Sequence, residues 1–217
     1  MTLDIEFADN PDSRCAVVLL LDTSSSMSGQ RIQELNKGLV TFQQELSQDH
    51  FASRRVEVAI ITFDSSVNTV QNFVTVDQFN PPSLSATGST AMGQAIETGL
   101  NLLESRKAVY RNNGIEYYRP WVLLITDGGP TDSWQNAAQM VRQLAANKGV
   151  QFWAIGVQGA NINILSQIAP TNKPPVMLKG LDFQALFEWL SNSMSVVSAS
   201  KPGDQTALPP ATWVIST

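Results

Sequence analysis

Short, continuously apolar segments alternate with longer amphipathic segments along this chain. Residues 16–21 read Ala-Val-Val-Leu-Leu-Leu, and residues 121–125 read Trp-Val-Leu-Leu-Ile. Short runs that are apolar at every position are typical of strands buried on both faces of a parallel sheet. Apolar or β-branched runs predict further strands at residues 56–63, 67–74, 150–157 and 176–178. The three polar residues 64–66 join two of these strands as a hairpin, which predicts one antiparallel edge strand.

The amphipathic segments predict helices. Between residues 31 and 48, apolar side chains recur at steps of three and four and form one stripe of a helix: Ile32, Leu35, Leu39, Phe42 and Leu46. Similar patterns predict helices at residues 90–106, 133–147, 162–168 and 183–197. Strands that alternate with helices predict right-handed crossovers and helices on both faces of the sheet. The predicted fold is therefore an α/β, Rossmann-like, doubly wound sheet of six strands, mostly parallel with one antiparallel edge strand.

The chain has 217 residues, which is the size of one domain. We expect an N-terminal extension over residues 1–13, the folded domain over residues 14–198 and a C-terminal tail over residues 199–217. The tail contains Pro and Gly, and we expect it to be a linker or frayed end rather than a segment that Trp213 docks onto the domain.

Composition excludes several classes of function. The formal net charge of −5 argues against nucleic-acid binding, which needs clustered Lys and Arg. The longest apolar run is far shorter than the roughly 20 residues that span a bilayer, and the acidic residues 1–14 do not resemble a signal peptide. We therefore expect a cytoplasmic protein without a membrane segment. With Cys15 and His50 as the single cysteine and histidine, disulfides, cysteine metal cages and a Ser/His/Asp triad are disfavoured.

Polar function must therefore come from oxygen atoms, and these collect in loops that follow the predicted strands or open a predicted helix. The loops are residues 22–29, 87–93 and 126–132. In an open α/β sheet such loops meet at the crevice beyond the carboxyl ends of the strands. Asp22, Ser24 and Ser26 alternate, so an extended loop would aim their oxygens at one side. Carboxylates and hydroxyls without nitrogen or sulfur ligands favour hard cations: Mg²⁺ first, with Mn²⁺ and Ca²⁺ as alternatives.

Three motifs occur in a characteristic order in these loops. They are Asp-x-Ser-x-Ser at residues 22–26, Gly-x-Thr at residues 88–90 and Thr-Asp-Gly at residues 126–128. Together they resemble the metal-ion-dependent adhesion site (MIDAS) of von Willebrand factor A-type (VWA) domains. The similarity extends over residues 13–198 and includes the order of strands and helices, so it implies the VWA fold.

The resemblance also implies roles for five residues. Ser24, Ser26 and Thr90 would coordinate the ion directly, and Asp22 and Asp127 would do so directly or through water. One coordination position would remain open. The Asp or Glu carboxylate of a protein partner would fill it, which implies a non-enzymatic, metal-dependent protein-binding domain.

A narrower resemblance concerns residues 118–132, which read Tyr-Arg-Pro-Trp-Val-Leu-Leu-Ile-Thr-Asp-Gly-Gly-Pro-Thr-Asp. This segment is similar to bacterial TerY-like proteins of tellurite-resistance and stress gene clusters. The resemblance implies a bacterial, cytoplasmic signalling module whose partners are a protein kinase or a PPM-type phosphatase.

Simpler interpretations of the same residues remain open. Residues 22–26 could form a Ser-rich turn that caps the following helix, Thr90 could be a helix N-cap, and Asp127 could be a turn residue. Asp132 is expected to cap the helix that follows it rather than to bind metal.

Other functions also remain open. A weak metal-dependent phosphatase or nuclease is one alternative, although Ser24 stands where a haloacid-dehalogenase-like enzyme would need a second carboxylate. The chain also lacks the Gly-Lys dipeptide of a P-loop and the Gly-x-Ser-x-Gly motif of a hydrolase. A metal-independent scaffold is the other alternative.

Overall fold

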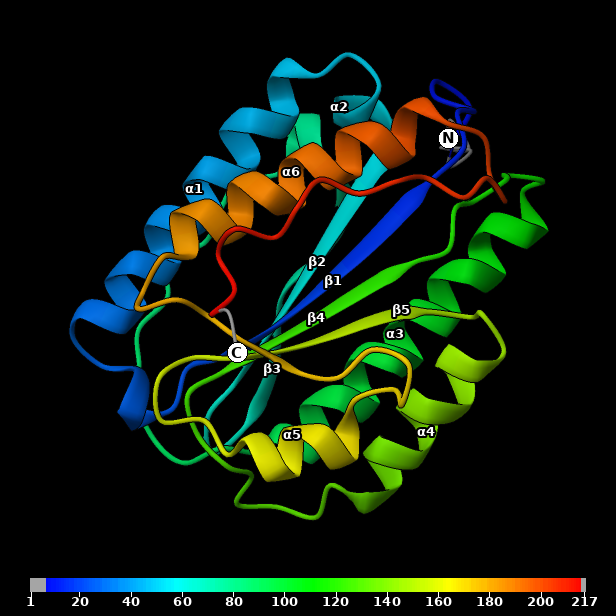
Figure 1. Ribbon diagram of the computed structural model, residues 1–217. Coiled ribbons are helices and arrows are strands. Elements are labelled where there is room, and N and C mark those ends of the chain that lie inside the picture. The colour runs from blue at the N-terminus through cyan, green and yellow to red at the C-terminus, as the bar shows by residue number, and fades with distance from the viewer. Residues whose placement is uncertain (1–6, 216–217) are drawn as a thin grey trace, which may run out of the picture.

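A six-stranded sheet with the order β3-β2-β1-β4-β5-β6 forms the centre of the protein (Figure 1). Its strands are β1 (Cys15–Asp22), β2 (Val56–Phe63), β3 (Val67–Thr75), β4 (Trp121–Thr126), β5 (Gln151–Gly156) and β6 (Val176–Met177). All neighbours pair in parallel except β2 and β3, which pair antiparallel and place β3 at the sheet edge. The predicted fold class is confirmed. This computed structural model describes residues 7–215, so residues 1–6 of the expected N-terminal extension lie outside the described residues.

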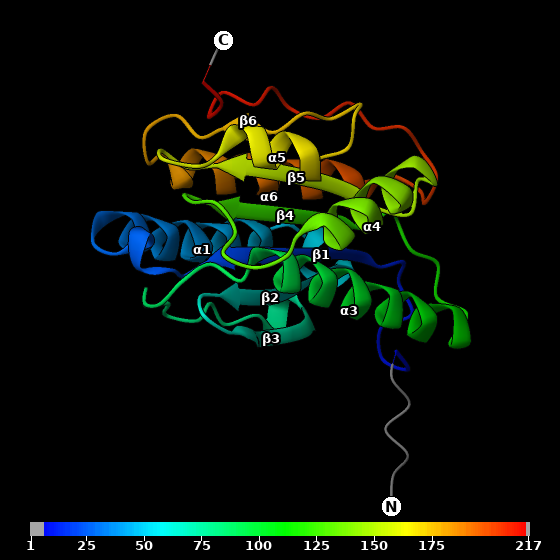
Figure 2. The ribbon, with the colours of Figure 1, turned by 90° about the horizontal axis from the view of Figure 1, so that it is seen from below.

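Helices cover both faces of the sheet, as Figures 1 and 2 show. One face carries α1 (Gln30–Gln48), α2 (Ala52–Arg55) and α6 (Phe183–Ala199), and the other carries α3 (Met92–Asn112), α4 (Gln135–Ala146) and α5 (Ile162–Ile168). Helix α2 and the 3₁₀ turns at Ser25–Met27 and Val76–Gln78 were not predicted, because elements of three or four residues are too short for a hydrophobic period. Across residues 7–215, no helix combines the length and the apolar character that crossing a membrane requires.

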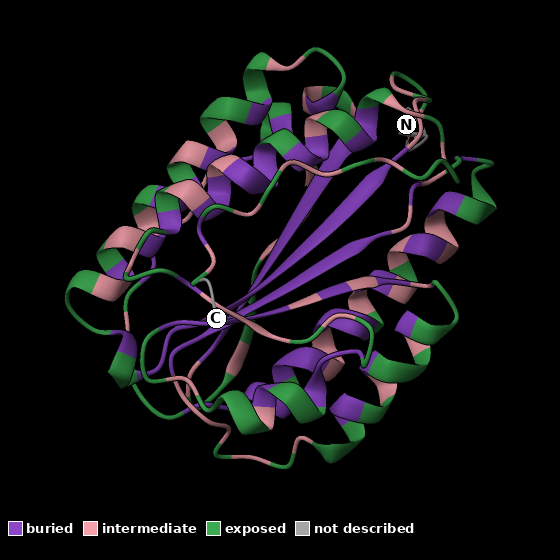
Figure 3. Ribbon diagram, viewed as in Figure 1, coloured by how far each residue is buried: buried purple, intermediate pink, exposed green. Residues whose placement is uncertain are grey.

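Strand β1 is the central strand and is buried along its whole length, as are β2 and β4 (Figure 3). Its alternate side chains enter two separate cores: Leu19 packs in the core under α1 and α6, and Leu20 packs in the core under α3 and α4. This explains why every position of the strand is apolar. Burial raises the pKa of the Cys15 thiol to about 12, so Cys15 is a small apolar core residue as expected.

The C-terminal tail is docked on the domain, and the expected linker or frayed end is wrong. Trp213 is completely buried, with its ring centroid 5.3 Å from that of Trp189. The indole nitrogen of Trp189 donates to the Pro209 carbonyl (2.9 Å), and Val214 bridges Leu178 beside β6. Figure 1 shows the tail running along α6 toward the sheet. A large aromatic ring that finds a cavity at the edge of the core overrides the Pro and Gly composition of the segment around it.

We predict that Trp213→Ala lowers the free energy of unfolding by about 3–5 kcal/mol, because it leaves a cavity beside Trp189. Urea unfolding followed by circular dichroism measures this change. Ile215→Ala is the matched control: its side chain is 46% exposed in the same tail, and its truncation should cost no more than about 0.5 kcal/mol. Equal effects of the two substitutions would mean that the tail adds little to the fold.

Candidate metal centre

The three oxygen-rich loops lie side by side at the carboxyl ends of β1 and β4. Backbone hydrogen bonds join them: Ser25 N donates to Gly88 O (3.1 Å), and Thr131 N donates to Thr90 O (2.9 Å). The loops after β1, before α3 and after β4 therefore form one structure. Such an assembly is expected where parallel strands end at the same edge of a sheet.

Asp22 is the last residue of β1 and is fully buried. Its Oδ1 accepts the backbone N–H of Ser24 (2.8 Å), and its Oδ2 accepts the hydroxyl of Thr126 (2.5 Å) at the end of β4. Burial raises the pKa of the Asp22 carboxyl above its usual value, the hydrogen bonds from Ser24 and Thr126 oppose this rise, and the charge of Asp127 adds to it. Within residues 7–215 no basic side chain pairs with Asp22, so its charge is neutralised only in part.

Ser24 and Ser26 bring two hydroxyls together above Asp22. Their Oγ atoms are 3.0 Å apart, and Ser24 is buried while Ser26 is exposed. The extended geometry predicted for this loop is wrong beyond Ser24, because Ser25–Met27 form a 3₁₀ turn. The tight turn, rather than strand-like alternation, places the two oxygens on the same side.

Thr90 lies just before α3 and is 6% exposed. Its backbone N–H donates to the Thr131 hydroxyl (3.1 Å), but its own hydroxyl has no hydrogen-bond partner in the described part of the chain. Gly128 faces the space between two hydroxyls: a Cβ atom there would stand 3.8 Å from Thr90 Oγ1 and 4.0 Å from Ser26 Oγ. The absence of a side chain at Gly128 keeps this space open.

Asp127 follows β4, and its side chain is 1% exposed. Its Oδ1 accepts the hydroxyl of Ser26 (2.6 Å). Its Oδ2 is buried without a well-aligned hydrogen bond, although Nη1 of Arg31 lies 3.0 Å away. The short distance indicates an ion pair, whereas the orientation leaves a lone pair of Oδ2 free. The site therefore contains a buried carboxylate oxygen that can accept a further partner.

The structure contradicts the predicted capping role of Asp132 and does not support the alternative in which Thr90 is a helix N-cap. The N-cap of α3 is Ala91 rather than Thr90, and the Ala91 side chain makes no capping hydrogen bond. Asp132 was expected to cap the following helix, but its carboxylate accepts the backbone N–H groups of Gly93 (3.0 Å) and Gln94 (2.8 Å) at the start of α3. Asp132 thus holds the loop after β4 against α3, which fixes the position of Thr90.

Sequence reasoning did not foresee the role of Arg31 at this site, or the contact of Thr126, a residue of the Thr-Asp-Gly motif, with Asp22. Arg31 lies in the first turn of α1 and joins three loops, since Nη1 also donates to Ser26 O (2.7 Å) and Nη2 donates to Gln158 O (3.0 Å). A basic residue in the first turn of a helix opposes the helix dipole. That unfavourable placement was the signal that Arg31 has a partner elsewhere. Thr126 gave no such signal, because a threonine at a strand end is common.

The residues present fit a hard divalent cation. The structure gathers all five predicted ligands, namely Asp22, Ser24, Ser26, Thr90 and Asp127. Residues 7–215 contain no cluster of three or more His, Cys, Asp or Glu side chains, so the site depends on hydroxyl oxygens. Oxygen donors of this kind suit Mg²⁺, Mn²⁺ and Ca²⁺. The ligand role of each residue stays a prediction.

These observations define a doubly wound domain with a cluster of carboxylate and hydroxyl oxygens at the carboxyl edge of its sheet. The chain belongs to the von Willebrand factor type A domain family, whose sequence model matches residues 16–190. No curated protein matches the sequence.

Solved structures share this fold. Proximal thread matrix protein 1 from the mussel byssus is 18% identical with a TM-score of 0.57, over 85% of this chain and 48% of that one. One of its structures has a zinc-occupied MIDAS motif. The ArnB paralog VWA2 from Sulfolobus acidocaldarius is 21% identical (TM-score 0.56, 83% and 45% covered), and a von Willebrand factor type A protein from Catenulispora acidiphila is 13% identical (TM-score 0.63, 85% and 43% covered). These identities support the fold alone, and this chain spans less than half of each structure.

We predict that Arg31→Gln raises the affinity for Mg²⁺ by about tenfold, because it removes a positive charge 3.0 Å from Asp127. Isothermal titration calorimetry with Mg²⁺ or Mn²⁺ measures the change.

Arg31→Lys is the control for this prediction, since it keeps the charge but loses the planar fork that joins three loops. Wild-type affinity in Arg31→Lys would identify charge as the cause. A weaker affinity in Arg31→Gln than in the wild type would contradict the prediction and make Arg31 a clamp for the loops.

Proposed function

We propose that the chain is a non-enzymatic protein-binding domain whose divalent cation captures an Asp or Glu carboxylate of its partner. The observation that carries this proposal is the oxygen of buried Asp127 that lacks a well-aligned hydrogen bond, together with exposed Ser26 and the free hydroxyl of Thr90. Mg²⁺ is the expected ion, with Mn²⁺ and Ca²⁺ as alternatives. VWA domains in general are adhesion or interaction modules, and the zinc-occupied motif of the mussel protein supports a divalent cation at such a site.

The five candidate ligands would contribute to cation binding in two ways. Ser24, Ser26 and Thr90 would hold the ion through neutral oxygens, while Asp22 and Asp127 would supply charge from below, directly or through water. When bound, the cation supplies an electrophilic centre that accepts a carboxylate. Arg31 offsets one of the two acidic charges, so the protein alone leaves a divalent ion incompletely neutralised. A carboxylate from outside would complete the neutralisation.

Metal-assisted hydrolysis is less well supported, because it needs a general base beside the ion. Asp127 is the nominal candidate, but its Oδ1 accepts a hydrogen bond from Ser26 and its Oδ2 lies at an arginine. Both contacts hold the carboxylate in a structural role, so it is not free to turn toward a water molecule beside the ion.

The cellular context is a finer part of the proposal. The similarity of residues 118–132 to TerY-like proteins supports a bacterial, cytoplasmic stress or tellurite-resistance module with a protein kinase or PPM-type phosphatase as partner. This context rests on that segment alone, whereas metal-dependent capture of a carboxylate rests on the geometry of the site.

A peptide array tests the proposed function without a known partner. Peptides that contain Asp or Glu are paired with copies that contain Asn or Gln, and the protein is applied in Mg²⁺ or in EDTA. We expect the acidic member of some pairs to bind in Mg²⁺ and to be lost in EDTA. Ser26→Ala and Thr90→Ala should each weaken this binding by about tenfold or more, because each removes a metal ligand.

Ser28→Ala is the matched control, since Ser28 is exposed in the same loop and its hydroxyl has no hydrogen-bond partner within the described residues. Binding that survives EDTA and both ligand variants would sink the proposal and favour a metal-independent scaffold. Mg²⁺-dependent turnover of a phosphate ester that Asp22→Asn abolishes would favour the enzymatic alternative.

A further inference from the structure

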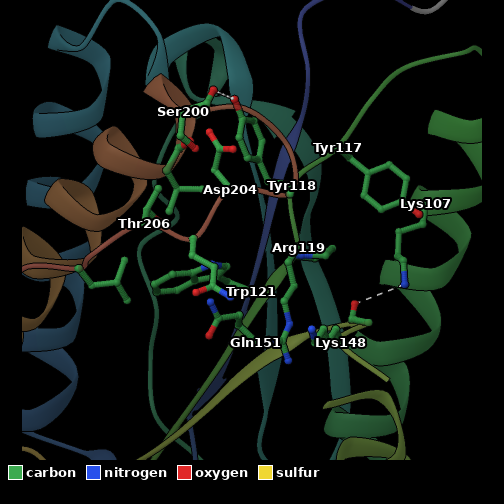
Figure 4. A pocket seen from close by; sticks show the side chains of 16 residues that line it. Lys107, Tyr117, Tyr118, Arg119, Trp121, Lys148, Gln151, Ser200, Asp204 and Thr206 are labelled. Atoms are coloured by element: carbon green, nitrogen blue, oxygen red, sulfur yellow. Dashed lines mark hydrogen bonds between the residues drawn. The ribbon is translucent and has the colours of Figure 1, made fainter. Parts of the chain in front are cut away.

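A cavity of about 670 Å³ lies at the amino ends of β4 and β5, at the sheet edge opposite the metal centre (Figure 4). The tail closes one side of it, since residues 203–206 and Leu208 contribute to its wall. Small-molecule sites in proteins have volumes of about 300–1,000 Å³. The docked tail therefore builds a cavity of the size that a small ligand needs.

The charges around the cavity are unbalanced. Lys107, Arg119 and Lys148 line it, and among the described residues of its lining Asp204 alone is acidic. Lys107 is already paired with Glu104, whose Oε1 lies 2.6 Å from its ammonium group. Arg119 and Lys148 form no ion pair within residues 7–215. The lining therefore carries positive charge that no described carboxylate neutralises.

Arg119 is held in place by backbone carbonyls rather than by an acid. Its Nε and Nη2 donate to Val150 O (2.9 and 2.5 Å), and Nη2 also donates to Ala145 O (3.2 Å). Burial lowers the pKa of the guanidinium. These carbonyls fix one edge of the guanidinium, so Nη1 remains available to a ligand in the cavity.

Lys173 adds a second desolvated cation next to the lining. Within the described residues, its ammonium group forms no ion pair. It donates a hydrogen bond to Gln151 Oε1 (2.8 Å) and lies 3.4 Å from the ring centroid of Trp153. Burial, together with the charge of Arg119, lowers the pKa of Lys173 to about 7. Arg119 and Lys173 are both half-buried, and their like charges would be stabilised by an anion placed between them.

Lys148 occupies a backbone conformation that ordinarily selects glycine. Its φ is +54°, in the last-turn motif of α4 where Gly149 N donates to Leu144 O (2.8 Å) and Lys148 N donates to Ala145 O (3.1 Å). Glycine is the usual residue at this position because a Cβ atom is strained there. A strained lysine that lines a cavity points to a use for its side chain rather than for its backbone.

We propose that this cavity binds a small organic anion, whose phosphate or carboxylate group meets Arg119, Lys148 and Lys173 while its apolar body lies against Tyr117 and Leu208. Figure 4 shows Arg119, Lys148 and Gln151 in the cavity wall, with Tyr117 lying next to Lys107. The partly exposed Tyr117 and Leu208 supply an apolar surface next to the cations. The proposal does not depend on the metal centre.

Isothermal titration calorimetry of the full chain with phenyl phosphate, benzoate, inorganic phosphate and neutral benzyl alcohol tests this proposal. We expect at least one aromatic anion to bind, more tightly than inorganic phosphate and with no binding of benzyl alcohol. The stronger of phenyl phosphate and benzoate identifies the preferred acid group. Absence of binding by all three anions at millimolar concentration, or equal binding of benzyl alcohol, overturns the proposal.

Two variants separate the ligand site from the fold. Lys148→Gly should raise the thermal unfolding midpoint, because glycine relieves the strained φ, and yet weaken anion binding roughly fivefold or more. Lys173→Met should weaken binding similarly. Lys37→Gln, which removes the charge of an exposed lysine on α1, should bind as the wild type does. Wild-type affinity in both cavity variants overturns the proposal. Ser26→Ala, which removes a proposed metal ligand, should bind the anion as the wild type does, whether or not the proposed metal binding is correct.

Discussion

The hydrogen bond from Thr126 to the buried carboxylate of Asp22 joins the ends of the two central strands, β1 and β4. Asp22 cannot leave the interior, because the strand that carries it is buried on both faces. Its charge is met by one hydroxyl and one amide instead of a cation. The neighbouring loops arrange Ser24, Ser26 and Asp127 around this incompletely neutralised carboxylate, so the oxygen-rich character of the candidate site follows from the burial of a single acid.

The two edges of the sheet have opposite electrostatic character. The carboxyl edge gathers carboxylates and hydroxyls, and Arg31 is in contact with them. At the amino edge lie Arg119, Lys148 and Lys173, which form no ion pair within the described residues 7–215. The helix dipoles complement the charges at both edges. The positive N-terminal ends of the helices lie toward the acidic carboxyl edge, and Lys148 lies at the negative C-terminal end of α4. A net charge of −5 for the whole chain conceals both features.

Much of the fold could be predicted from the sequence, because the period of apolar residues directly reports burial. The run at residues 16–21 predicted a strand covered on both faces, and the stripe from Ile32 to Leu46 predicted α1. The five candidate ligands were predicted from their spacing in loops that parallel strands bring to one edge, and the structure places these loops side by side. The 3₁₀ turn at Ser25–Met27 and the contact of Asp132 with α3 escaped prediction, since both depend on hydrogen bonds between atoms that the sequence does not place.

By itself, the sequence determined the doubly wound sheet and the oxygen chemistry of the site, because hydrophobic period and residue type are local properties. Only the tertiary structure decided that Trp213 is buried against Trp189, that Arg31 reaches Asp127 and that the docked tail closes a basic cavity. Each of these contacts joins segments far apart in the chain. Their energies come from desolvation and close packing, which exist only once the segments have met.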